Sequence, residues 1–165
     1  MKNSDENPHW LAELQIGHKR QVRAYSPAVE DYLEIIYGLI TTKGYAKAVD
    51  IATYVHARPP TVTKMLQRLH SGKLIVYEKY RRVNLTSRGE LLAKGIRERH
   101  ELLVDFLRLL GIDGETAKID VCATDGLEHS LNPKTLEKIR KFVNYVKAHP
   151  QWFAQYGQST SAARA

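Results

Sequence analysis

The 165-residue chain is poor in cysteine and in long apolar runs, and each shortage excludes a class of protein. The single cysteine, Cys122, can form no intramolecular disulfide and rules out a zinc site built from four cysteines. The longest apolar stretch, Leu102 to Leu110, is interrupted by Asp105 and Arg108, so no transmembrane helix is predicted. The first fifteen residues are charged and lack the apolar core of a secretory signal. We therefore expect a reduced, cytoplasmic protein with no membrane partner.

Acidic residues are also scarce relative to basic ones, 18 against 25, which gives a formal net charge of +7. The excess is concentrated between Arg58 and Arg99, where eleven basic residues stand against three acidic ones. A block polarised in this way indicates a polyanionic partner such as nucleic acid. The alternative from charge alone is an ordinary solvated basic surface.

The first half of the chain shows helical periodicity from Ser26-Pro27 onward, where the Ser26 hydroxyl is predicted to cap a helix and Pro27 takes its first position. Three helical segments are followed by two short apolar runs with a charged turn between them, which indicates a β-hairpin. This order is typical of a winged helix-turn-helix. The predicted elements are helices over 26–43, about 47–56 and from Pro60 or Thr61 to 71, and strands over 74–77 and 83–85.

The second half is predicted to be wholly helical. A capping box at Ser87-x-x-Glu90 opens a long helix from about 88 to 110, and a further helix follows over about 114–129. Asn132-Pro133 opens a last helix with a narrow apolar seam, and no internal repeat is found. The fold class is therefore mainly α: an N-terminal winged helix-turn-helix with a small β-hairpin wing, then an all-α domain. The predicted divisions are an arm over 1–25, the DNA-binding domain over 26–87, the helical domain over 88–150 and a tail over 151–165.

The third predicted helix is the expected reader of the DNA major groove. Its apolar positions, Val62, Leu66 and Leu69 among them, face the core and leave polar side chains outward. Thr and Gln bond to base edges, and Lys and Arg bond to guanine or phosphate. The alternative is a polar helix face beside a charged turn. The candidate DNA-binding residues are Arg58, Thr61, Thr63, Lys64, Gln67 and Arg68, with Arg81 and Arg82 at the wing tip.

A second constellation combines carboxylates with imidazoles. Asp125, Glu128 and His129 follow i, i+3, i+4 spacing, which places them on one face of the predicted 114–129 helix. Asp31 and Glu34 share a face of the first helix, and His100 lies on the apolar stripe of the long helix. If these faces pack together, six ligands for a divalent cation converge: Asp31, Glu34, His100, Asp125, Glu128 and His129. Taken singly, the acids are also explained by solvation, and His100 by a bond to a backbone carbonyl.

Several motifs occur in the order found in one known family. They include Ser26-Pro27-x-x-Glu30-Asp31-Tyr32-x-Glu34, Pro60-x-Val62-Thr63-Lys64-Met65, Tyr77-Glu78-Lys79-Tyr80-Arg81, Arg99-His100-Glu101-Leu102-Leu103 and Gly126-Leu127-Glu128-His129. From about Ser26 to Val146 the chain resembles the manganese-responsive regulators of the diphtheria-toxin-repressor family. The arm and the tail lie outside this resemblance.

The resemblance implies a homodimeric winged-helix repressor that binds double-stranded operator DNA when it holds Mn²⁺ or Fe²⁺. It transfers ligand roles onto Asp31, Glu34, His100, Glu128 and His129. The family carries Glu or Cys at the position of Asp125, so this chain departs from the pattern there with a shorter carboxylate. The last-helix seam of Leu136, Ile139, Val143 and Val146, with the stripe of the long helix, is the expected dimer contact.

The donor chemistry favours Mn²⁺, because four carboxylates and two imidazoles form a hard, oxygen-rich set. An iron-responsive member of the family is one alternative, and Cys122 is a candidate additional ligand. A metal-independent winged-helix regulator is another. A small metallohydrolase would use the same cluster, but the chain lacks H-E-x-x-H, G-x-S-x-G and a phosphate-binding glycine loop, so no enzyme is expected.

Overall fold

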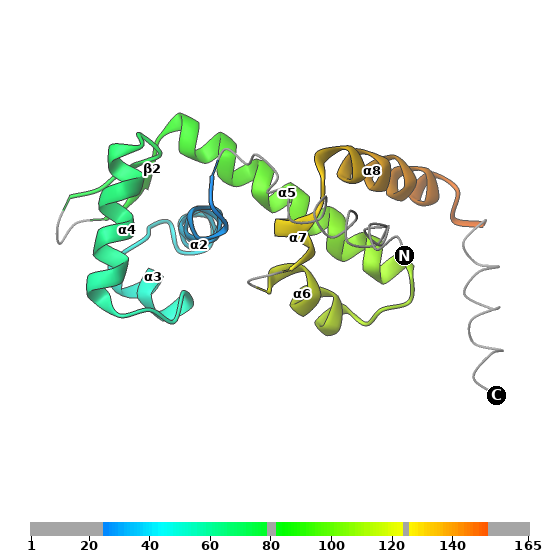
Figure 1. Cartoon of the computed structure of the whole chain (residues 1–165), viewed down its shortest axis with the longest axis horizontal. Helices are drawn as coiled ribbons and strands as arrows, with labels where there is room; N and C mark the ends of the chain where they lie inside the picture. The colour runs from blue at the N-terminus through cyan, green and yellow to red at the C-terminus, as the bar shows by residue number, and fades with distance from the viewer. Residues whose placement is uncertain (1–24, 79–81, 124–125, 152–165) are drawn as a thin grey trace, which may run out of the picture.

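The computed structural model describes residues 25–78, 82–123 and 126–151. It is mainly helical with one two-stranded antiparallel hairpin, and the predicted fold class is confirmed. Two lobes lie at the two ends of the long helix α5 (Ser87–Leu109), which belongs to both (Figure 1). Within the described residues, no helix is both long and apolar enough to cross a lipid bilayer.

The first lobe is a winged helix-turn-helix. It contains α2 (Pro27–Lys43), α3 (Ala48–Tyr54), α4 (Pro59–Ser71) and the strands β1 (Ile75–Val76) and β2 (Asn84–Leu85). The strands pair with Ile75 opposite Leu85 and Val76 opposite Asn84, and an additional bridge joins Ala46 to Val83. Burial of an apolar face from each helix holds the lobe together. Its fully buried side chains include Leu33, Ile36, Ile51, Leu66 and Leu69.

Two predicted helix caps are corrected. The Ser26 hydroxyl makes no capping bond to α2; the Ser26 carbonyl oxygen instead accepts from the Val29 N–H at 2.9 Å. The cap of α5 is Thr86, not Ser87, because the Thr86 Oγ1 accepts from the Gly89 N–H at 3.0 Å. Thr86 is fixed there by a tertiary contact, since its hydroxyl also donates to the Lys73 carbonyl oxygen at 2.9 Å.

The second lobe is built around the C-terminal half of α5. The helices α6 (Gly114–Cys122), α7 (Leu127–Ser130) and α8 (Pro133–Ala148) pack against it (Figure 1). Val143 and Val146 of α8 are 1% and 2% exposed within the single chain. These two seam residues are therefore buried without a second protomer, and the prediction that they contact one is wrong.

The predicted continuous helix over 114–129 is also wrong. α6 ends at Cys122, and α7 begins only at Leu127, after an extended Gly126 with φ −65° and ψ 167°. A Cβ at Gly126 would lie 2.3 Å from the Val121 carbonyl oxygen, so the close approach of α7 to the end of α6 requires glycine. The break redirects Glu128 and His129 toward α2 and α5.

Candidate functional site

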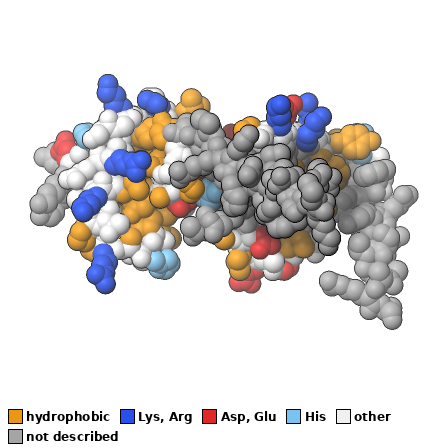
Figure 2. All heavy atoms as spheres, viewed as in Figure 1, with side chains coloured by type: hydrophobic (Ala, Val, Ile, Leu, Met, Phe, Trp, Pro, Cys, Tyr) orange, Lys and Arg blue, Asp and Glu red, His pale blue; other side chains and the backbone are white. Residues whose placement is uncertain are grey.

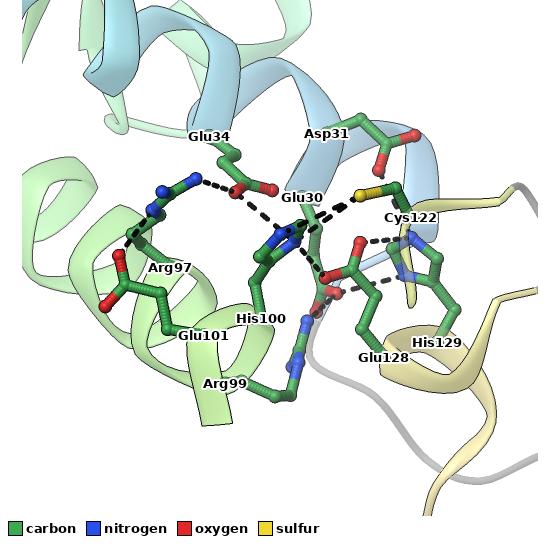
Figure 3. A network of polar contacts seen from close by, with 10 residues as sticks. All are labelled: Glu30, Asp31, Glu34, Arg97, Arg99, His100, Glu101, Cys122, Glu128 and His129. Atoms are coloured by element: carbon green, nitrogen blue, oxygen red, sulfur yellow. Dashed lines mark hydrogen bonds and ion pairs between the residues drawn. The ribbon is translucent and has the colours of Figure 1, made fainter. Parts of the chain in front are cut away.

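The candidate site lies where α2, α5 and α7 meet, at the junction of the two lobes (Figure 3). Helix α2 supplies Asp31 and Glu34, α5 supplies His100, and α7 supplies Glu128 and His129. The structure thus brings together five of the six residues predicted as metal ligands. The sixth, Asp125, lies outside the described residues.

Glu128 lies between two groups of candidate donors. Its Oε2 is 3.3 Å from the His100 Nδ1, and the Glu34 Oε1 lies 3.7 Å from the same nitrogen. Its other oxygen, Oε1, is 3.2 Å from the His129 Nε2, which is 3.3 Å from the Asp31 Oδ1. One group is Glu34, His100 and Glu128, and the other is Asp31, Glu128 and His129. In each group the candidate donor atoms, one from each residue, lie within 4.8 Å of one another. One carboxylate therefore connects both groups.

The electrostatics are those of crowded acids. Burial raises the pKa of Asp31 above its ordinary value, and the negative charges of Glu128, Glu34 and Glu30 raise it further, while His129 acts in the opposite direction. Positive charge close to the cluster would therefore stabilise the ionised form of Asp31. A divalent cation would provide such a charge, and the donors are all carboxylate oxygens and imidazole nitrogens, which suit Mn²⁺ or Fe²⁺.

Cys122 lies at the edge of the same cluster. Its Sγ is 3.7 Å from the His100 Nδ1 and 3.8 Å from the His100 Nε2. Burial and the neighbouring acids raise the pKa of this thiol to about 11, so it is protonated at neutral pH in this arrangement. Because only a thiolate is an effective ligand, metal binding by Cys122 would require this thiol to lose its proton, and its role as an additional ligand stays a prediction.

Three charged residues at the junction escaped the sequence interpretation. Arg97 lies 3.4 Å from Glu34, while Glu30 contacts both Arg99 and His129. Glu30 is 6% exposed, and its neighbour Val29 on α2 is buried as well. The only sequence signal for Glu30 is an acidic residue next to an apolar one at the start of a helix. Its partners Arg99 and His129 are distant in sequence, so the sequence could not predict the contacts.

The candidate nucleic-acid surface is on α4 and the wing. Thr61, Lys64, Gln67 and Arg68 are exposed, and Thr63 is half-buried. In Figure 2, lysine and arginine side chains project along the outer side of this lobe, and acidic ones gather near α6. Arg58 and Arg82 are also exposed. The Arg82 guanidinium lies 5.0 Å from the centre of the Tyr45 ring. Arg81 lies outside the described residues.

A winged helix-turn-helix joined to a helical domain, with carboxylates and imidazoles clustered at the junction, defines a metal-dependent DNA-binding regulator. Residues 25–83 match the family model described as iron dependent repressor, N-terminal DNA binding domain. Residues 86–152 match the model of the same family's metal binding and dimerisation domain. The chain belongs to the iron-dependent repressor family.

Curated relatives agree with this assignment. The chain is 42% identical over 125 residues to the HTH-type transcriptional regulator MntR of Listeria welshimeri, which covers 76% of this chain and 86% of that protein. It is 44% identical over 120 residues to MntR of Bacillus velezensis, covering 73% and 82%.

Solved structures agree as well. The manganese regulator SloR superposes with a TM-score of 0.56 and 30% identity over 71% of this chain and 54% of that one. The apo form of the manganese-activated repressor ScaR gives a TM-score of 0.57 and 28% identity over 70% and 54%. The chain thus spans about half the length of these two solved proteins.

Proposed function

We propose that this protein is a Mn²⁺-dependent, homodimeric repressor that binds operator DNA and controls genes for metal uptake. It acts in the cytoplasm, by binding and not by catalysis. The proposed metal ligands are Asp31, Glu34, His100, Asp125, Glu128 and His129. The observation that carries the proposal is the meeting of side chains from both lobes at one cluster.

The cluster can couple metal binding to DNA binding because its members belong to different domains. Asp31 and Glu34 are on α2, which packs against α5 and supports the helix-turn-helix; Glu128 and His129 are on α7 of the second lobe. The negative charges of Glu34, Asp31 and Glu128 repel one another across this junction. When bound, a divalent cation supplies positive charge that offsets this repulsion. The carboxylates can then hold α2 and, through its packing, α4 in one orientation.

Mn²⁺ is proposed as the metal because the donors are hard and because two similar solved proteins, SloR and ScaR, are described as manganese-dependent regulators. Fe²⁺ is the second candidate, since the family models carry the description iron dependent repressor. Both ions suit the same oxygen and nitrogen donors, so titration of the purified protein with each ion under anaerobic conditions distinguishes them.

The dimer contact requires apolar surface other than the buried part of the α8 seam. The second lobe exposes Ile119, Phe142 and Tyr145 by 64%, 37% and 52%, and we propose these side chains as part of the contact between protomers. In a two-fold dimer the two α4 helices would enter successive major grooves about 34–36 Å apart.

The central test measures DNA binding with and without metal. A duplex is first selected from a random library with the Mn²⁺-loaded protein, and its affinity is then measured by fluorescence anisotropy in Mn²⁺ and in EDTA. We expect at least about tenfold tighter binding in Mn²⁺, within the 5–150-fold range typical of coupled sites. Equal affinity in the two conditions contradicts the proposal.

The DNA-binding surface predicts a specific salt dependence. Lys64→Ala and Arg68→Ala should each reduce the slope of log affinity against log salt concentration by about 1 if the lost side chain contacts a phosphate. Lys141→Ala is the matched control, because Lys141 is a 68% exposed lysine paired with Glu137 on α8. If the control changes the slope as much as the α4 variants, the interface is misplaced.

A further inference from the structure

Two exposed cations of the first lobe contact an aromatic ring instead of a carboxylate. The Lys47 Nζ lies 5.2 Å from the centre of the Tyr45 ring, and the Arg82 guanidinium carbon lies 5.0 Å from the same point. The Tyr45 side chain is half-buried. Within the residues that the structure describes, neither cation forms a salt bridge with an acid. These three residues, here called the wing-base cluster, therefore carry two uncompensated positive charges.

The backbone places the wing-base cluster on one face. Ala46 and Val83 form an antiparallel bridge, in which the Val83 N–H donates to the Ala46 carbonyl oxygen at 2.8 Å. Both of these side chains are fully buried. Successive side chains of extended backbone point to opposite faces, so the chain neighbours of these two residues face away from the core. Tyr45, Lys47 and Arg82 are such neighbours.

This arrangement has a cost for folding. In the register set by the bridge, Lys47 lies opposite Arg82, and like charges directly opposite each other are destabilising. The Tyr45 ring offsets part of that cost through its contact with both cations. Elsewhere exposed cations pair with acids, as Lys94 does with Glu90 at 2.9 Å. Two cations kept together without an acid favour a site for an external anion.

The position of the wing-base cluster identifies the anion. Val83 directly precedes β2, and β1 packs against α4, so the cluster lies at the base of the wing, close to the helix proposed to read DNA (Figure 1). Lysine and arginine side chains are the usual partners of the phosphates that flank the major groove. A guanidinium over an aromatic ring also keeps N–H groups free for phosphate oxygens.

We propose that Lys47 and Arg82 contact phosphates of the duplex beside the groove that α4 enters, and that Tyr45 is a positioning residue that holds the Arg82 guanidinium in place for this contact. The inference rests on the proposed function, because it requires that the chain bind DNA, and it uses none of the proposed metal ligands. It adds Tyr45 and Lys47 to the DNA-binding surface.

The first test is the salt dependence of DNA binding by the Mn²⁺-loaded full chain, measured by fluorescence anisotropy on the selected duplex. Lys47→Ala and Arg82→Ala should each reduce the slope of log affinity against log salt concentration by about 1, as for the loss of one phosphate contact. Both replace exposed side chains, and thermal melting verifies that the variants are folded. An unchanged slope in either variant, with a reduced slope in Lys64→Ala, overturns the inference and leaves the proposed function standing.

The second test separates the ring of Tyr45 from its hydroxyl group and its bulk. Tyr45→Phe keeps the ring and should bind the duplex as tightly as the unmodified chain does. Tyr45→Leu removes the ring and should weaken binding by about two- to fivefold, the range for an exposed cation–π contact. In the Arg82→Ala background Tyr45→Leu should cause little further loss, because the ring acts through the guanidinium.

Tyr54→Leu is the matched control on the same lobe. The Lys43 Nζ lies 5.9 Å from the centre of the Tyr54 ring, but this lysine also pairs with Asp50 at 3.6 Å. Its charge is therefore compensated within the protein, and the variant should keep both the affinity and the salt slope of the unmodified chain.

Equal weakening by Tyr45→Leu in the two backgrounds overturns the positioning role, as does a Tyr45→Phe protein that binds as weakly as Tyr45→Leu. Tyr45→Met is the second ring-free variant if Tyr45→Leu does not fold. The slopes of Lys47→Ala and Arg82→Ala test the phosphate contacts independently of both. If the unmodified chain binds no duplex in Mn²⁺, the proposed function fails and this inference fails with it.

Discussion

Glu128→Gln is expected to eliminate the response of this protein to Mn²⁺ while leaving the fold intact. Glu128 is 3% exposed, and its two oxygens face the two imidazoles of the cluster, at 3.3 Å from His100 and 3.2 Å from His129. Among the described residues it is the one shared by both groups of candidate donors. Glutamine keeps the shape of the side chain and removes the negative charge from both groups at once.

We expect Mn²⁺ affinity to fall by more than the 10–100-fold loss that is typical when a residue hydrogen-bonded to a metal ligand is replaced. The gain in operator affinity on adding Mn²⁺ should disappear, and so should the increase in melting temperature that a ligand of the native state produces. The metal-free variant should melt at the same temperature as the unmodified chain or above it, because one of several mutually repelling acids has been neutralised.

Glu137→Gln provides the matched control, since Glu137 is 61% exposed on α8 and pairs with Lys141. It should keep the full Mn²⁺ response in both DNA binding and melting. A Glu128→Gln protein whose operator affinity still rises with Mn²⁺ would show that the metal binds elsewhere.

Gly89→Ala is expected to have the largest effect on stability. A Cβ at this position would lie 1.8 Å from the Leu74 carbonyl oxygen and 2.8 Å from the Leu74 carbonyl carbon. Both atoms belong to backbone, so no rotation of a side chain can relieve the overlap. The same carbonyl oxygen accepts from the Thr86 N–H at 3.0 Å, which ties the first turn of α5 to the loop after α4.

Overpacking at such a contact costs about 3 kcal/mol. We expect that loss in the free energy of unfolding, measured by urea titration in EDTA. Gly95→Ala is the control on the same helix, because a Cβ there meets nothing within 4 Å. Alanine at an open helical position should stabilise by up to about 1 kcal/mol. If the two variants unfold at the same urea concentration, α5 does not approach Leu74 as described.

The sequence alone predicted the elements that depend on local signals. Periodic apolar residues along α2 and α4 and the proline at the start of each indicated helices. Asn132 caps α8 as predicted, with its side-chain oxygen accepting from the Lys134 N–H at 2.9 Å. These signals come from residues that are close in sequence, so they do not depend on the tertiary structure. The chemical types of the candidate donors were also fixed by the sequence.

Only the tertiary structure decided which side chains meet. Periodicity shows which face of a helix is apolar but not what covers it. The sequence therefore predicts a partner at the α8 seam, although Val143 and Val146 are buried within the single chain. The break between α6 and α7 depends on a close backbone approach at Gly126, which no periodicity reports. Glu30 and Arg99 pair across 69 positions of the chain. This contact depends on the packing of α2 against α5, which buries charges that are distant in sequence. A buried charge is stable only when it is paired.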